Sequence, residues 1–472
     1  MQMPFFRAAI IFTIIAGLLT AGNPNAMLPA QAAPDANKLL FLPLVQKNYP
    51  PPPTVFGAET HSPSTSRIQQ AVQANLYWLR YSTISWAAIE PVRTDPPTYH
   101  WETVDEAGLE AAARAGFKTI LVVKHIPDWA QKKSGVTCGP IAQDSMDEFS
   151  QFVRALVQRY SPYPYYVRYW EFGNEPDVDP SLVPPDSVFG CWGDKKDKYY
   201  GGGYYADMLK WAYPPLKEAS PDSSLIIGGL LLDCDPQDPP PGQATGCKPA
   251  KFFEGILNNQ GANYFDVVAF HTYATYYQGS ILDEDDPKWD SRGGQVSGKV
   301  NFLRQVMSDY GVNKPILMSE VALLCSEQDC VTPGASFLDS QADFVVSVNA
   351  RAWGLGLLGS VWYTLEESSW RQSGLFIQAT PKPGYHALVF MAKELQDATL
   401  GSEITQYNGL RGYEFHLPAK RVWILWSPDG VTGQQISLPS GVKAVYDKFG
   451  NPLTPVQNSL WVVHPTYIEL AK

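Results

Sequence analysis

Two glutamates stand at corresponding points of separate apolar segments. Glu175 follows residues 170–174, and Glu320 follows residues 316–319. A solvated surface glutamate has little reason to end an apolar segment. Two carboxyl groups that face one another can divide the roles of acid, base and nucleophile between them. We therefore take Glu175 and Glu320 as the catalytic candidates.

Both glutamates belong to a repeating pattern of short apolar segments and helical segments. The pattern repeats in eight rounds between residues 55 and about 396. Such alternation predicts an α/β fold in which a parallel sheet closes into a (β/α)8 TIM barrel. Strands are expected at residues 55–59, 78–82, 118–123, 167–172, 225–230, 267–271, 316–320 and 361–364. Helices are expected at residues 64–74, 101–115, 146–160, 204–219, 249–259, 298–310, 337–354 and 384–395.

The two glutamates then end the fourth and seventh strands, at the barrel face where active sites lie. Asn174-Glu175-Pro176 resembles the acid/base motif of the glycoside hydrolases of clan A, and Glu320 stands where that clan has its nucleophile. The resemblance is closest in type to glycoside hydrolase family 39 and covers residues 55–472. It implies a retaining hydrolase of poly- or oligosaccharides, with Glu175 as the general acid/base.

The resemblance also implies partners for the nucleophile. Arg80 stands where the clan has an arginine that stabilises this anion, so we expect it to lower the pKa of Glu320. His271 and Tyr273 lie on one side of the sixth strand, where the clan often has a hydrogen-bond partner of the nucleophile. Glu171 lies deeper on the fourth strand and is interpreted as a buried partner of a cation.

Other expected site residues contact the sugar. His125 and Trp129 resemble the loop at the glycone subsite, and Trp362 resembles the aromatic floor on which the apolar face of a sugar stacks. The expected substrate-binding residues are Arg80, His125, Trp129, Asn174, His271, Tyr273 and Trp362.

Charge and motifs argue against several other classes. The formal charge of −11 and the lack of long basic clusters argue against a nucleic-acid partner. The G-x-G-x-x-G match at residues 354–359 ends a helix and enters a strand, which is the reverse of what dinucleotide binding requires. No C-x-x-C or H-E-x-x-H motif indicates a metal. We expect no cofactor and no metal, and the sequence indicates no oligomeric state.

The six cysteines indicate disulfides in an exported chain. Six cysteines allow many pairings, and the sequence alone does not select one. Spacing favours Cys325 with Cys330 and Cys234 with Cys247, which leaves Cys138 with Cys191. All six are expected in loops on the C-terminal face of the barrel.

The sequence predicts accessory segments at both ends of the chain. Residues 1–32 resemble a signal peptide, because Arg7 precedes an apolar run that is shorter than the roughly 20 residues a membrane span needs. We expect a secreted protein that has no membrane anchor after cleavage. Residues 33–54 read as a proline-rich tether, or alternatively as an edge strand of a later domain. Residues 55–397 form the barrel, and residues 398–472 read as a small C-terminal β-sandwich-like domain.

The sequence alone does not exclude two other functions. A carbohydrate-binding protein without activity would keep an aromatic cleft but would not need both glutamates. A cell-surface scaffold on the same fold would need a cleft closed by its own loops.

Overall fold

The structure is a computed structural model that describes residues 53–242, 246–326, 334–366 and 370–472. The expected signal peptide and nearly all of the expected tether lie outside these residues. The described residues belong to one compact unit that spans Asn48–Lys472. In the part of the chain that is described, no helix is long and apolar enough to cross a membrane.

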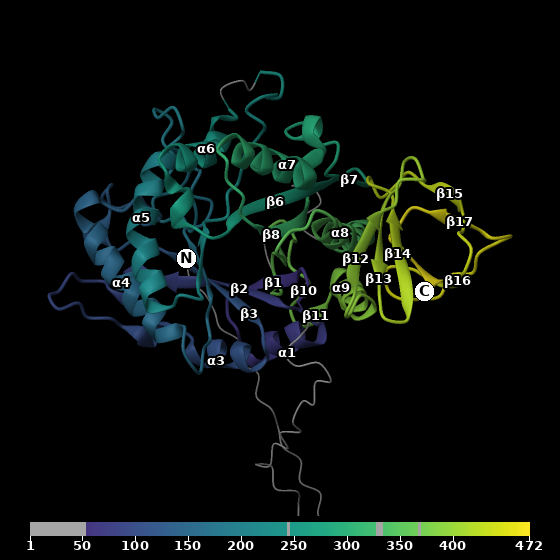
Figure 1. The fold of residues 1–472 in the computed structure, drawn as a ribbon, viewed down its shortest axis with the longest axis horizontal. Coiled ribbons are helices and arrows are strands. Elements are labelled where there is room, and N and C mark those ends of the chain that lie inside the picture. The colour runs from purple at the N-terminus through teal and green to yellow at the C-terminus, as the bar shows by residue number, and fades with distance from the viewer. Residues whose placement is uncertain (1–52, 243–245, 327–333, 367–369) are drawn as a thin grey trace, which may run out of the picture. The chain divides into compact units, whose positions relative to one another are not determined.

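Within the described residues, eight parallel strands form a closed barrel (Figure 1). Their order is β5-β4-β3-β2-β1-β9-β8-β6, and isolated parallel bridges from Ile226 to Val267 and from Leu230 to Phe270 join β5 to β6. The barrel strands are β1 (Phe56–Thr60), β2 (Trp78–Ser85), β3 (Lys118–Lys124), β4 (Tyr169–Phe172), β5 (Ser224–Ile227), β6 (Val268–Tyr277), β8 (Ile316–Cys325) and β9 (Ser360–Trp362). The predicted (β/α)8 barrel is therefore confirmed.

Helices alternate with these strands and surround them (Figure 1). They are α1 (Thr65–Gln73), α2 (Trp86–Ile89), α3 (Glu106–Arg114), α4 (Met146–Tyr160), α5 (Gly202–Ala219), α6 (Lys251–Asn258), α7 (Gly294–Asp309), α8 (Ala335–Gly354) and α9 (Pro383–Glu394). Helix α3 begins later than expected, because the Asp105 carboxylate accepts a hydrogen bond from the amide of Gly108 and caps the helix there.

The interior of the barrel changes from apolar to charged toward the C-terminal ends of the strands. Apolar side chains fill the lower level, namely Trp78, Ile120, Ile226, Val267, Ala269, Leu317 and Val361. Strand side chains alternate, so Arg80 lies on the same side as Trp78, and Glu171 on the same side as Tyr169. Both Arg80 and Glu171 are fully buried. Charged groups therefore form the next level inside the barrel.

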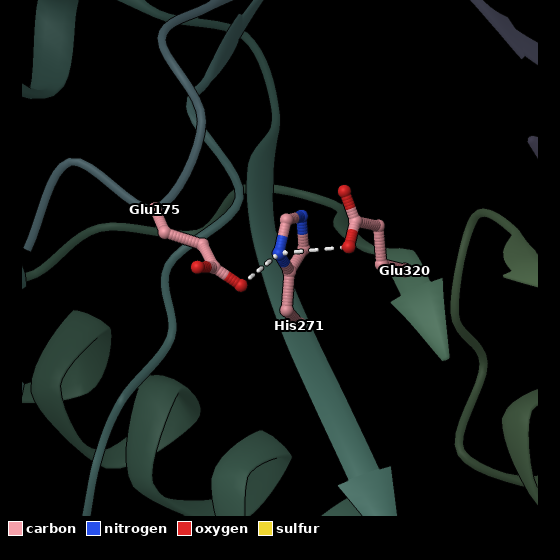
Figure 2. A group of neighbouring side chains, drawn as sticks. All are labelled: Glu175, His271 and Glu320. Carbon is pink, nitrogen blue, oxygen red and sulfur yellow. Dashed lines mark hydrogen bonds and ion pairs between the residues drawn. The ribbon is translucent and has the colours of Figure 1, made fainter. Parts of the chain in front are cut away.

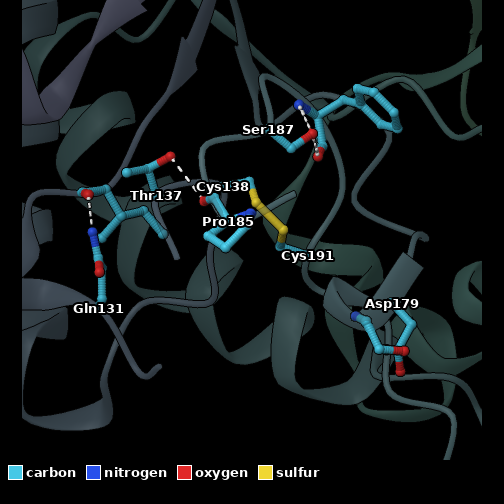
Figure 3. The surroundings of a disulfide bond; sticks show 10 residues. Gln131, Thr137, Cys138, Asp179, Pro185, Ser187 and Cys191 are labelled. Atoms are coloured by element: carbon cyan, nitrogen blue, oxygen red, sulfur yellow. Dashed lines mark hydrogen bonds between the residues drawn. A yellow bond between two sulfur atoms is a disulfide. The ribbon is translucent and has the colours of Figure 1, made fainter. Parts of the chain in front are cut away.

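A disulfide joins the loops that follow β3 and β4 (Figure 3). Cys138 bonds Cys191, with Cα atoms 5.4 Å apart. The two backbones also meet beside this bond, since the amide of Thr137 donates to the carbonyl of Pro185. The disulfide thus links two loops on the C-terminal side of the barrel.

A second disulfide, Cys234–Cys247, closes the loop after β5, with Cα atoms 4.8 Å apart. Two of the three predicted pairs are therefore present. Cys325 is the last residue of β8 rather than a loop residue, because this strand runs five residues beyond Glu320. Its predicted partner, Cys330, lies outside the described residues.

The C-terminal segment folds as antiparallel sheets, as expected (Figure 1). A five-stranded sheet has the order β12-β13-β14-β18-β16, and β15 pairs with β17. Their bounds are β12 (Thr399–Glu403), β13 (Arg411–His416), β14 (Lys420–Trp426), β15 (Gln434–Ser437), β16 (Val442–Tyr446), β17 (Ser459–Val462) and β18 (Thr466–Ala471). Leu425 and Ile468 pack with Ile436 and Val462 between the two sheets. This core makes the segment sandwich-like.

Candidate active site

Arg80 on β2 holds the charged level of the barrel together. Its guanidinium donates to both carboxylate oxygens of Glu171, at 3.1 Å from Nε and 2.8 Å from Nη2. Nη2 also donates to Oδ1 of Asn174 at 2.8 Å, and Nη1 donates to Glu59 and to Oε1 of Glu320. One buried cation thus contacts three carboxylates, and the expected role of Glu171 as a partner of a cation agrees with these contacts.

Glu320 is held at both carboxylate oxygens. Oε1 accepts from Arg80, and Oε2 accepts from the hydroxyl of Tyr273 on β6. Only about 4 % of Glu320 is exposed. Two donors from different strands therefore fix the orientation of this carboxylate, and both favour its ionised form.

His271 on β6 stands between the two glutamates (Figure 2). Its Nδ1 lies 2.9 Å from Oε1 of Glu175 and 3.5 Å from Oε2 of Glu320. One atom from each of the three residues lies within 4.8 Å of the others. The ring is fully buried, and the Nζ of Lys299 donates to the backbone carbonyl of His271 at 2.9 Å. Lys299 therefore holds the backbone at His271, and the ring of His271 contacts both carboxylates.

The backbone at Glu175 adopts a left-handed conformation, with φ at 48°. This region is uncommon for a residue with a side chain and is often found at functional sites. The amide of Glu175 donates to the carbonyl of Gly229 at 3.0 Å, and Asn174 accepts from the amide of Gly190. Neighbouring loops thus hold the turn that directs Glu175 toward His271.

Burial and charge act in opposite directions on the pKa values of this cluster. Burial is the largest effect on the pKa of Glu320 and raises it, while His271 and Arg80 act to lower it. Arg80 acts to lower this pKa, as expected, but its effect together with that of His271 does not offset burial. Burial also acts to raise the pKa of Glu59, but Arg80 and His61 outweigh it and hold that pKa at about 2. For His271, burial acts to lower the pKa, but Glu320 and Glu175 outweigh it and raise the pKa.

The structure brings most of the expected site residues together. The indole rings of Trp129 and Trp362 lie outside this cluster. The residues that meet in one cluster are Arg80, Asn174, Glu175, His271, Tyr273 and Glu320. His125, at the end of β3, lines a hollow together with Asn174. Trp129 instead packs edge-on against Trp86 and donates to the carbonyl of Glu90.

Trp362 does not reach the carboxylates, contrary to expectation. Side chains alternate along β9, and Val361 points into the barrel, so Trp362 points outward. Its indole is buried, donates to the carbonyl of Ser373 at 3.0 Å and packs against Phe344.

The ring of Tyr363 takes the inward position, and Trp370 lies beside it. Both rings contact Tyr273, with centroids 6.2 Å and 4.8 Å away. About 45 % of Trp370 is exposed. The sequence patterns did not indicate these two aromatics or Glu59. The signal for Glu59 was the same as for the other glutamates, because it is a carboxyl group near the end of an apolar strand.

No protein-family model matches the sequence, and a search of curated proteins gives no match. Solved structures do match the fold. A family 39 glycoside hydrolase from Bacteroides cellulosilyticus has a TM-score of 0.66 at 16 % identity, over 89 % of this chain and 81 % of that one. A conserved exported protein from Bacteroides fragilis has a TM-score of 0.61 at 13 % identity, over 89 % and 98 % of the two chains. A monomeric β-xylosidase from Caulobacter crescentus has a TM-score of 0.57 at 15 % identity, over 89 % and 97 %. At these identities the chain shares the fold of TIM-barrel glycoside hydrolases.

Proposed function

We propose that this protein is a secreted retaining glycoside hydrolase in which Glu320 is the nucleophile and Glu175 is the general acid/base. The observation that carries the proposal is the close pair of carboxylates bridged by His271, with oxygens of both within 4.8 Å of its nitrogen and of each other. Retaining enzymes have their two carboxyl groups about 5 Å apart, whereas inverting enzymes leave room for a water molecule between them.

In the first step, an oxygen of Glu320 attacks the anomeric carbon while Glu175 donates its proton to the leaving oxygen. Arg80 and Tyr273 keep the attacking carboxylate oriented through their hydrogen bonds. The products are a covalent glycosyl-enzyme and the released alcohol. In the second step, Glu175 accepts a proton from water, which attacks the same carbon and frees Glu320.

Aromatic rings beside the nucleophile support a carbohydrate substrate. Tyr273, Tyr363 and the partly exposed Trp370 pack edge-to-face with one another. A flat ring binds the apolar C–H face of a sugar with little loss of side-chain entropy. We propose that Trp370 and Tyr363 take the sugar-stacking role that the resemblance assigned to Trp362.

We further propose that residues 1–32 direct export and are removed, that residues 33–54 are a tether, and that residues 55–397 and 398–472 are the catalytic and accessory domains. Two disulfides support an oxidising compartment, since such bonds persist mainly in exported proteins. Detection of a mature chain in the culture medium, with its N-terminus near residue 33, tests this part of the proposal.

The catalytic roles are tested with alanine variants and azide. We expect Glu320→Ala to abolish turnover of every substrate, because no glycosyl-enzyme can form without the nucleophile. We expect Glu175→Ala to lose about 100- to 10,000-fold in rate on glycosides with poor leaving groups, and far less on aryl glycosides with acidic ones. Azide needs no base, so it should restore turnover of Glu175→Ala and give a glycosyl azide of retained configuration.

The matched control is Glu102→Ala, which removes an exposed carboxylate and should leave activity unchanged. An azide product of inverted configuration from Glu175→Ala, or rescue of Glu320→Ala alone, would exchange the two roles. If the wild-type protein cleaved no glycoside in a broad panel but bound one of them, the inactive carbohydrate-binding function would replace this proposal.

A further inference from the structure

Lys299 is a buried cation to which the proposed mechanism assigns no role. It lies on α7, and its Nζ donates to two backbone carbonyls, that of Leu231 at 2.8 Å and that of His271 at 2.9 Å. Leu231 belongs to the loop after β5, whereas His271 lies on β6. Burial of an ammonium group is costly, so such a group is stabilised only by well-placed partners. Here one partner is the backbone of the residue that contacts both glutamates.

The backbone at His271 is irregular. The pairing of β6 with β8 shifts register between Phe270 and His271. A shift of this kind bends a strand and changes the direction of the side chain beside it. Lys299 bonds the carbonyl directly after the shift, and the amide of His271 donates to the carbonyl of Leu230 at 2.8 Å. These two bonds therefore hold the backbone that sets the direction of the His271 ring.

Asp177 holds the same loop from the other side. It follows Glu175 by two residues, and it is buried. Its two carboxylate oxygens accept from the amide of Leu231 at 2.9 Å and from the next amide in the chain at 2.8 Å. Leu231 is thus bonded through its amide to Asp177 and through its carbonyl to Lys299. A chain of hydrogen bonds therefore runs from the segment of Glu175 to His271, and the 2.9 Å contact between these two side chains closes it into a ring.

The two charged members of this ring attract one another. Burial raises the pKa of Asp177 to about 6 and lowers the pKa of Lys299 to about 8. Of the groups that oppose the effect of burial on Lys299, Asp177 is the strongest. Asp177 is ionised above pH 6 and Lys299 is protonated below pH 8, so both are charged at pH 7. The other charged groups nearby are Glu175 beside Asp177, and Asp233, Asp286 and Lys288 beside Lys299.

We propose that Asp177 and Lys299 are positioning residues, which hold the ring of His271 against Glu175 through the backbone of Leu231. This inference rests on the proposed function. Proton transfer by Glu175 requires a fixed carboxyl group, and a misplacement of about 1 Å reduces a rate by up to about 100-fold. Loss of either charged residue should therefore impair the acid step more than the nucleophilic attack.

The test compares two leaving groups at pH 7. Lys299→Met removes the charge and both hydrogen bonds but keeps most of the side-chain volume. For a glycoside with a poor leaving group, kcat/KM should fall about 10- to 100-fold, because its bond breaks only with a proton from Glu175. For an aryl glycoside with an acidic leaving group, kcat/KM should change little, because Glu320 keeps its own two donors. Asp177→Asn, which has one acceptor oxygen in place of two, should change the two values in the same way.

The matched control is Lys448→Met. Lys448 is also a buried lysine that donates to a backbone carbonyl, that of Asp339, but it joins the segment after β16 to α8. This variant should leave the ratio of the two kcat/KM values unchanged. An equal fall on both substrates in Lys299→Met and Asp177→Asn would show a structural role alone, and no fall on either would show no role. Each of these results would overturn the inference. If Lys299→Met did not fold, the isosteric Asp177→Asn would decide between them.

A second measurement separates this inference from the proposed function. Burial acts to lower the pKa of His271, but Glu320 and Glu175 outweigh it. In Lys299→Met the ring should lose part of its contact with Glu175, so NMR of 15N-labelled histidine should show a lower pKa for His271. The signal of His271 is assigned by its absence from His271→Gln. Loss of the positive charge of Lys299 by itself would instead raise this pKa.

The two measurements can fail separately. If the wild-type protein cleaved no glycoside, the proposed function would fail, but a lower pKa of His271 in Lys299→Met would still support the positioning role. An unchanged or higher pKa would contradict that role, whether or not the protein is active.

Discussion

Arg80 contacts more negative charge than one guanidinium neutralises. It binds Glu59, Glu171 and Glu320 inside the barrel, and Glu175 adds a fourth carboxyl group through His271. Buried ions are stabilised only when their partners and hydrogen bonds are well placed. The cluster therefore links folding to protonation, because a carboxylate that gains a proton loses its ion pair with Arg80.

Glu59 makes this link measurable. Its pKa is held at about 2, below its usual value of 4.5, so it stabilises the fold above pH 4.5 and loses that effect as the pH falls toward 2. Near pH 6, we expect the free energy of unfolding of the wild-type protein to be higher than that of Glu59→Gln by up to about 3 kcal/mol. The difference should shrink steadily below pH 4.5. Urea unfolding of both proteins at pH 6, 4 and 3 measures it.

The control is Glu110→Gln, which changes a carboxylate on the outer helix α3. The difference in the free energy of unfolding between Glu110→Gln and the wild-type protein should vary little between pH 6 and pH 3. A difference for Glu59→Gln that stays constant from pH 6 to pH 3 would contradict the prediction.

Single residues also show how far the sequence predicts the site. A carboxyl group at the end of an apolar strand indicated Glu175 and Glu320, because strand ends meet at one face of a barrel. The inward position was assigned to Trp362, one residue too early, because the side of the sheet on which a strand residue lies depends on the register of the strand. Tyr363 points inward instead. The sharing of Arg80 among its partners depends on side chains from several strands, which no local pattern encodes.

At the scale of elements, the sequence predicts most of the barrel strands and helices to within a few residues. However, β6 and β8 end six and five residues later than expected, and β7 (Ser280–Leu282) was not expected. This strand pairs antiparallel with an extension of β6. Gln278 and Gly279 form its turn, with φ at 49° and 95°. Two such residues are typical of a tight hairpin. The expected strand ended at His271, so the hairpin beyond it was not foreseen.

The two disulfides close loops of very different length, which predicts different contributions to stability. Cys138–Cys191 spans 53 residues, and Cys234–Cys247 spans 13. Loop-closure entropy gives about 4 kcal/mol for the longer loop and about 3 kcal/mol for the shorter. We therefore expect the double variant Cys138→Ser/Cys191→Ser to lose more free energy of unfolding than Cys234→Ser/Cys247→Ser, by about 1 kcal/mol. Urea unfolding without reductant measures both losses. A larger loss from the shorter loop would show that local contacts, and not chain entropy, decide the effect.

At the scale of the whole molecule, the C-terminal sheet shares a core with the barrel helices. Phe415 on β13 packs edge-to-face on Trp353 of α8, and Tyr467 on β18 packs on Phe390 of α9. The opposite face of the sheet, which includes Leu425, packs toward β15 and β17. Because strand side chains alternate, β14 and β18 contribute buried side chains to both cores. The sheet is therefore expected to unfold together with the barrel.

This cooperativity can be tested at Phe415, which is fully buried between the sheet and α8. Phe415→Ala should cost about 3–5 kcal/mol, since it opens a cavity in the shared core. Hydrogen exchange in increasing urea should then show the barrel strands and strands β12 to β18 losing protection at one urea concentration, lower than in the wild-type protein. The control is Trp461→Ala on β17, where the ring is 63 % exposed. Its loss should leave the urea concentration of the transition unchanged. Loss of protection in the sheet while the barrel stays protected would mean that the two cores are independent, and the contacts of Phe415 and Tyr467 would then hold together two separately stable parts.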